Sequence, residues 1–109
     1  MKFTLRFTEP ALVDFNDFVA WYFEHSPGKQ AEDIVSEINE AFKFVSRYPR
    51  MRQVDDFSFS GDRELRHVTV WKFNFYYLVL DVERSLDIVG VVHQSAGPEK
   101  LRSKLAPDR

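Results

Sequence analysis

The sequence predicts an α+β fold in which an N-terminal strand, an antiparallel helical hairpin and a three-stranded antiparallel meander follow in that order. Two hydrophobic patterns support this fold class. Apolar residues alternate near the N-terminus and after residue 64, and they recur every three or four positions between residues 9 and 48. A chain of 109 residues has room for one core, so we expect a single domain over residues 1–109, with the helices packed on one sheet face and a short tail from about residue 97.

The first strand and the first helix adjoin each other. Phe3, Leu5 and Phe7 alternate with polar residues, which is typical of a strand with one buried face. Thr8 is a suitable N-cap, and Pro10 in the first turn loses no hydrogen bond. The apolar stripe of this helix contains Leu12, Phe15, Val19 and Tyr22.

A second helix follows the break His25-Ser26-Pro27-Gly28, with Ser26 as N-cap and Pro27 as its first residue. Pro49 ends it. The short break predicts that the two helices form an antiparallel hairpin with one buried face. The apolar stripe of the second helix contains Ala31, Ile34, Val35, Ile38, Ala41, Phe42 and Val45.

The C-terminal half contains the meander. Residues 50–63 are polar, and we expect them to form an irregular connection that ends at Gly61-Asp62. A tight turn at Glu83-Arg84 separates the last two strands. In the tail, Leu101 and Leu105 either fold back onto the domain or form a docking element. The three expected strands cover about residues 64–71, 72–82 and 85–94.

The aromatic run KFNFYYLVLD, residues 72–81, could be a stacking platform for bases or the centre of the sheet. Alternation places Phe73, Phe75, Tyr77 and Val79 on one face, where the helices can cover them. The other face offers chiefly Tyr76, whereas a stacking platform needs several aromatic rings on an open face. We therefore predict that the run belongs to the core.

Composition limits the classes of function. Net charge is −2, so the chain as a whole does not attract nucleic acid. No apolar stretch reaches the roughly 18 residues that span a bilayer, and the N-terminus lacks an apolar signal region, so we expect a cytoplasmic protein without membrane contact. Basic residues nevertheless cluster in the middle of the chain, either as a solvated surface or as an acid-binding patch. The cluster comprises Lys43, Arg47, Arg50, Arg52, Arg63 and Arg66.

Several short motifs occur in a characteristic order over most of the chain. They are FTEPALVDF (7–15), SPGKQAEDI (26–34), VSRYPRM (45–51), ELRHVTV (64–70), FNFYYLVLD (73–81) and IVGVVHQS (88–95). Their joint order resembles the RelE/ParE superfamily of toxins from bacterial type II toxin–antitoxin systems. The resemblance implies a cognate antitoxin whose acidic segment wraps the toxin. RelE-like members cut mRNA on the ribosome, whereas ParE-like members inhibit DNA gyrase and are not nucleases.

The residue at position 74 helps to decide between these two activities. In FNFYY it occupies the position where both branches usually have an arginine, and the arginine expected after the last strand is missing from residues 93–97. A neutral amide stabilises a developing phosphorane charge less than a guanidinium does, so RNA cleavage loses support. The ParE-like branch often has a histidine where His93 stands.

The resemblance therefore favours a ParE-like plasmid-stabilisation toxin that acts by protein contact, with DNA gyrase as its target, and that is not an enzyme. Two alternatives stay open: a RelE-like endoribonuclease acting on ribosome-bound mRNA, and an inactive toxin fold that retains antitoxin binding. As a nuclease, the chain would use Arg66, Tyr76 and His93. We expect no cofactor and no metal, because the histidine spacing matches no metal motif. The partner-binding candidates are Arg66, Asn74, Tyr76 and His93.

Overall fold

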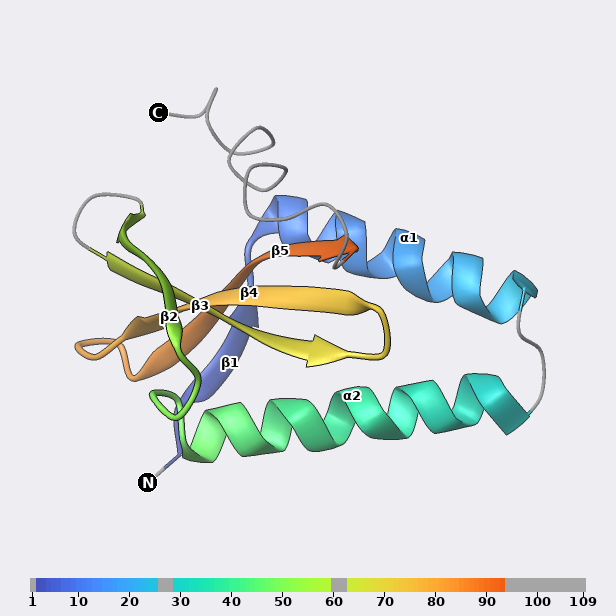
Figure 1. The fold of residues 1–109 in the computed structure, drawn as a ribbon, viewed down its shortest axis with the longest axis horizontal. Helices are drawn as coiled ribbons and strands as arrows, with labels where there is room; N and C mark the ends of the chain where they lie inside the picture. The colour runs from blue at the N-terminus through green and yellow to red at the C-terminus, as the bar shows by residue number, and fades with distance from the viewer. Residues whose placement is uncertain (1, 26–28, 60–62, 94–109) are drawn as a thin grey trace.

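The computed structural model describes residues 2–25, 29–59 and 63–93 and confirms the predicted α+β class (Figure 1). Two helices lie beside one sheet, and the strands of the meander follow them in the chain. The elements are β1 (Thr4–Phe7), α1 (Glu9–His25), α2 (Lys29–Arg47), β2 (Val54–Phe59), β3 (Arg63–Val70), β4 (Phe73–Leu80) and β5 (Ser85–His93).

Both helices begin or end close to where the sequence predicts. Thr8 caps α1: its carbonyl oxygen accepts the Leu12 N–H at 2.9 Å, and its hydroxyl oxygen accepts the Ala11 N–H at 3.4 Å. α2 ends at Arg47, two residues before Pro49. The predicted cap at Ser26-Pro27, the Gly61-Asp62 turn and the tail with Leu101 and Leu105 lie outside the described residues.

The described strands form one five-stranded sheet in the order β1-β5-β4-β3-β2. The pairs β3–β4 and β4–β5 are antiparallel, as the predicted meander requires. β1 lies at one edge and runs parallel to β5, with Leu5 opposite Leu86. The helical hairpin is therefore the connection that carries the chain away from this edge strand and back to the other side of the sheet.

The prediction of an irregular connection over residues 50–63 was wrong, because Val54–Phe59 forms β2 and pairs antiparallel with β3. The register shifts twice along this strand, between Val54 and Asp56 and between Asp56 and Phe59. Such irregularities break the alternation by which a strand is recognised, and aspartates are depleted in strands. The sequence of β2 therefore reads as a loop.

The main core lies between the helices and one face of the sheet, with α1 along β5 and α2 along β3 and β1 (Figure 1). Phe75 and Tyr77 are fully buried there. Aromatic contacts connect the helices to the sheet. The ring centre of Phe18 on α1 lies 4.3 Å from that of Phe73 on β4, and the ring centre of Phe42 on α2 lies 5.5 Å from that of Phe75 on β4. The predicted core role of the aromatic run is confirmed, and so is the placement of both helices on one sheet face.

The opposite sheet face carries a second cluster of buried side chains, and Tyr76 is 2% exposed within it. Here the pairing of β4 with β5 shifts: Tyr76 lies opposite Gly90, whereas Tyr77 lies opposite Ile88. This bulge inserts Val89 into the second cluster. The other members are Leu65, Leu78, Leu80 and Val92.

Candidate functional site

Arg66 lies on the helix-side face of the sheet, because its cross-strand partner on β4 is the core residue Tyr77. Its side chain is buried. The guanidinium Nε donates to the carbonyl oxygen of Arg52 at 3.0 Å. Nη1 lies 2.8 Å from the Glu64 carboxylate, an ion pair whose orientation does not make a hydrogen bond. Arg66 therefore holds the connection between α2 and β2, and its charge is already paired.

Two further contacts fix the same connection. The Tyr77 hydroxyl donates to the carbonyl oxygen of Pro49 at 2.8 Å. Arg50 donates two hydrogen bonds to the Asp81 carboxylate, at 3.1 and 2.7 Å. These bonds lower the pKa of Asp81 and raise the pKa of Arg50. Residues 49–52 are thus attached to the sheet through three neighbouring positions.

Asn74 and Tyr76 lie on the face opposite the helices. Asn74 pairs with Thr69 across β3 and β4, and the Thr69 hydroxyl donates to the Asn74 amide oxygen at 2.7 Å. Tyr76 pairs with His67 in the same way, and their rings are 5.3 Å apart. The two rungs are consecutive on this face. Asn74 is 9% exposed, so this amide offers little surface to a ligand.

His93 ends β5 on the helix-side face, opposite Phe73, and its ring stands edge-on to Phe73 at 5.3 Å. Its side chain is exposed. Phe73 also stacks on Trp71 at 5.9 Å, and Trp71 packs edge-on against Tyr22 at 4.9 Å. His93 therefore belongs to an aromatic row at the β3–β4 turn.

Trp71 is the residue of this row that sequence reasoning missed. It is 39% exposed and has a φ of 56°, in the left-handed region that costs a residue with a Cβ roughly 1–2 kcal/mol. Lys72 places its Nζ 5.4 Å from the Trp71 ring centre. The expected strands over about 64–71 and 72–82 left no interval for a turn. In the structure Trp71 and Lys72 form a two-residue turn, which requires a left-handed conformation, and no Gly or Asn marks that turn in the sequence.

The four candidates do not converge on one point. Asn74 and Tyr76 are neighbours on one face, while Arg66 and His93 lie on the other. On that face Arg66 pairs with Tyr77 and His93 with Phe73, and four residues along a strand span about 13 Å. Arg66, Tyr76 and His93 therefore do not form a set that could act on one phosphate.

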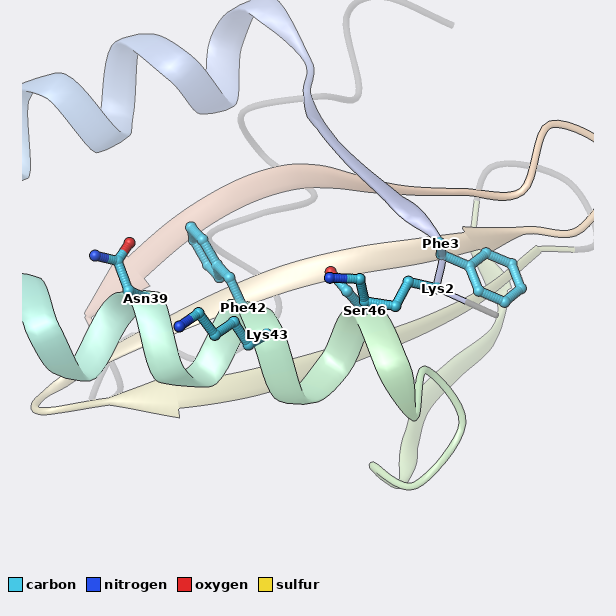
Figure 2. Close-up of a pocket in the computed structure, with 6 residues that line it drawn as sticks. All are labelled: Lys2, Phe3, Asn39, Phe42, Lys43 and Ser46. Atoms are coloured by element: carbon cyan, nitrogen blue, oxygen red, sulfur yellow. The ribbon is translucent and has the colours of Figure 1, made fainter.

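A pocket of about 290 Å³ opens between α2 and the two residues that precede β1, and none of the four candidates lines it (Figure 2). The Phe3 amide donates a hydrogen bond to the Ser46 carbonyl oxygen at 2.9 Å, and both residues line the pocket. The lining residues are Lys2, Phe3, Asn39, Phe42, Lys43 and Ser46.

The described residues contain neither a group of three metal-ligating side chains nor a helix that could span a membrane. Among residues 2–25, 29–59 and 63–93, no three His, Asp or Glu side chains are grouped as metal ligands would be. Neither described helix has the length and apolar character needed to cross a bilayer.

Residues 5–97 match the sequence model of a family described as the ParE toxin of the type II toxin–antitoxin system parDE. A search of curated proteins gave no significant match. Among solved structures, the chain is similar to one from the chromosomal ParDE toxin–antitoxin system of P. aeruginosa, with a TM-score of 0.62 and 18% identity, covering 84% of this chain and 96% of that one. It is also similar to a double Arg→Ala mutant of the E. coli toxin RelE in the free state, with a TM-score of 0.63 and 15% identity, covering 99% and 98%. At these identities the structures share the fold.

Proposed function

Because the chain belongs to the ParE toxin family of type II toxin–antitoxin systems, we propose that it is a toxin that inhibits DNA gyrase by protein–protein contact and is neutralised by a cognate antitoxin. The family match over residues 5–97 carries this proposal. A gyrase target would place the action of the toxin in the bacterial cytoplasm, and the pairing with an antitoxin would suit plasmid stabilisation.

The distribution of polar side chains supports contact rather than catalysis. RNA cleavage needs a group that activates the 2′-hydroxyl and another that protonates the leaving oxygen, each typically worth 10²–10⁴ in rate. The side chains considered for these tasks lie apart: Tyr76 is buried on one face, and Arg66 is buried on the other beneath residues 49–52. Asn74 has its amide oxygen engaged by Thr69.

Of the four partner-binding candidates, we propose that His93 makes direct contact. Its side chain is exposed and its ring is fixed against Phe73, so little conformational entropy would be lost on binding. Arg66, Asn74 and Tyr76 would support the surface through packing and hydrogen bonds.

A gyrase supercoiling assay with the purified chain tests the proposal. We expect inhibition that the product of the adjacent reading frame relieves. His93→Ala should weaken inhibition without lowering the melting temperature. Val82→Ala, at the distant β4–β5 turn where Val82 is 95% exposed, is the matched control and should have no effect.

The alternatives give different outcomes. Filamentation and DNA damage on expression in a bacterial host would accompany gyrase inhibition. Rapid translation arrest with discrete cuts in ribosome-bound mRNA would identify a RelE-like endoribonuclease. Normal growth and unaffected gyrase, with the neighbouring gene product still bound, would identify an inactive toxin fold.

A further inference from the structure

We propose that the outer side of α2 is a self-complementary surface on which two copies of the chain pair through antiparallel α2 helices. The surface continues into the turn after the helix. We call it the α2 stripe; it contains Asp33, Glu37, Glu40, Phe44, Arg47, Tyr48 and Met51, all of them exposed.

The spacing places these residues on one side of the helix. From Asp33 to Arg47, successive members are three or four positions apart, which aligns side chains along a helix surface; Tyr48 follows Phe44 at the same spacing. The backbone continues the stripe past Arg47: the Tyr48 amide donates to the Phe44 carbonyl oxygen at 2.8 Å, and the Met51 amide donates to the Tyr48 carbonyl oxygen at 3.2 Å. The apolar stripe of α2, with Ile34 and Ile38, faces the core instead.

Acidic side chains lie in the first part of this surface, and basic side chains lie in the last part and in the turn that follows. Residues 32–40 contain four acidic and no basic side chains, whereas residues 43–52 contain four basic and no acidic ones. Like charges consequently lie four positions apart at Asp33–Glu37 and at Lys43–Arg47, an arrangement that destabilises an isolated helix.

The helix dipole accounts for only part of this division. It favours acidic residues in the first turn and basic residues in the last, and its effect falls off beyond them. Glu37 and Glu40 lie in the middle of α2 and gain little from it. The Glu40 carboxylate already lies 3.8 Å from the Lys43 amine on the same helix. Glu37 has a clearer role if it meets a basic side chain of another molecule.

The basic end of the stripe also exposes three large apolar side chains. Phe44 is 39% exposed, Tyr48 48% and Met51 70%, and the rings of Phe44 and Tyr48 lie 5.5 Å apart. The bonds that Tyr77 and Arg66 donate to residues 49 and 52, and those that Arg50 donates to Asp81 in the turn after β4, hold residues 49–52 in place. An apolar surface that is already rigid binds at a smaller entropic cost than a flexible one.

An antiparallel arrangement places the acidic part of each stripe against the basic and apolar part of the other. If a twofold axis passes the helix at the level between Glu40 and Phe44, Glu37 of each copy lies opposite Arg47 of the other. Such an isologous contact repeats every favourable pair. The 19 residues of α2 span only about 28 Å, so the interface is small and its charge pairs are exposed. We therefore expect a weak dimer whose affinity falls as salt is added.

Charge reversal tests this geometry by analytical ultracentrifugation of the full chain over a range of concentrations. Glu37→Arg and Arg47→Glu should each weaken dimerisation at least tenfold, because each places like charges opposite each other. The double variant should recover wild-type association. An equimolar mixture of the two single variants should form a mixed dimer. Glu32→Arg, a charge reversal on the same helix but off the stripe, is the control and should dimerise normally.

Circular dichroism and melting temperatures establish that every variant is folded, since both positions are exposed. The proposal fails if the wild type is monomeric at all concentrations and salt levels. It also fails if the single variants dimerise normally, or if the double variant and the mixture do not recover association. Weakening by Arg47→Glu alone, with Glu37→Arg unaffected, would exclude the antiparallel pairing, because that pairing uses both residues equally.

Discussion

Arg66 and Tyr77 are cross-strand neighbours, and both hold the connection between α2 and β2, Arg66 through the Arg52 carbonyl oxygen and Tyr77 through that of Pro49. The backbone of this connection thereby has side-chain donors from two adjacent strands. An arginine that sequence reasoning considered for partner binding thus performs a structural task.

Removing one of these hydrogen-bond donors should weaken the attachment of the connection without creating a cavity in the core. Tyr77→Phe keeps the buried ring and loses the bond to Pro49, so we expect the free energy of unfolding to fall by about 0.5–1.5 kcal/mol. Urea denaturation measures the change. Tyr48→Phe, at an exposed ring, is the control, and equal effects of the two variants would show that the Pro49 bond contributes nothing.

The buried side of α2 should be sensitive to truncation. Ile38 is 4% exposed, and Ile38→Ala should lower the free energy of unfolding by about 2–5 kcal/mol. Val35→Ala on the same helix, where Val35 is 37% exposed, should cost much less. Thermal and chemical denaturation of both variants would reveal whether the difference exists; similar values would contradict the assigned helix face.

Acid should remove the contribution of the Arg50–Asp81 pair. The hydrogen bonds from Arg50 lower the pKa of Asp81 below its ordinary value, so the pair stabilises the fold fully above that ordinary value and loses its contribution as pH falls through the lower, folded pKa. Asp81→Asn should therefore destabilise the protein slightly at pH 7 and converge with the wild type in strong acid. A difference that persists there would mean that the substitution acts through something other than charge.

Restoring an arginine at position 74 should not create a nuclease. Asn74 is nearly buried and bonded to Thr69, so Asn74→Arg should lower stability, and it adds neither an acid nor a base nearby. We expect wild type and Asn74→Arg alike to leave mRNA intact on translating ribosomes. Primer extension on ribosome-bound message decides this, and discrete cuts within A-site codons by the wild type would favour the endoribonuclease.

Most of the fold can be predicted from the sequence, because apolar residues recur at every second position in the core strands and at every third or fourth position in the helices. Alternation correctly separated Phe73, Phe75 and Tyr77, which face the helices, from Tyr76, which lies on the opposite sheet face. It failed at β2, where bulges interrupt the period. It also could not foresee that Arg66 would reach Arg52, because the two positions are distant in sequence, or that Trp71 would take a left-handed conformation, because no Gly or Asn marks that turn.

The parallel pairing of β1 with β5 affects when the molecule can be completed during synthesis. Arg6 and Asp87, whose side chains bond across these strands at 2.9 and 3.2 Å, are 81 positions apart in the sequence. A growing chain therefore carries β1 and both helices for most of its translation without the strand that joins β1 to the sheet. Closing so long a loop is entropically costly and comes late. The finished sheet, and every surface built on it, forms only after β5 has been synthesised.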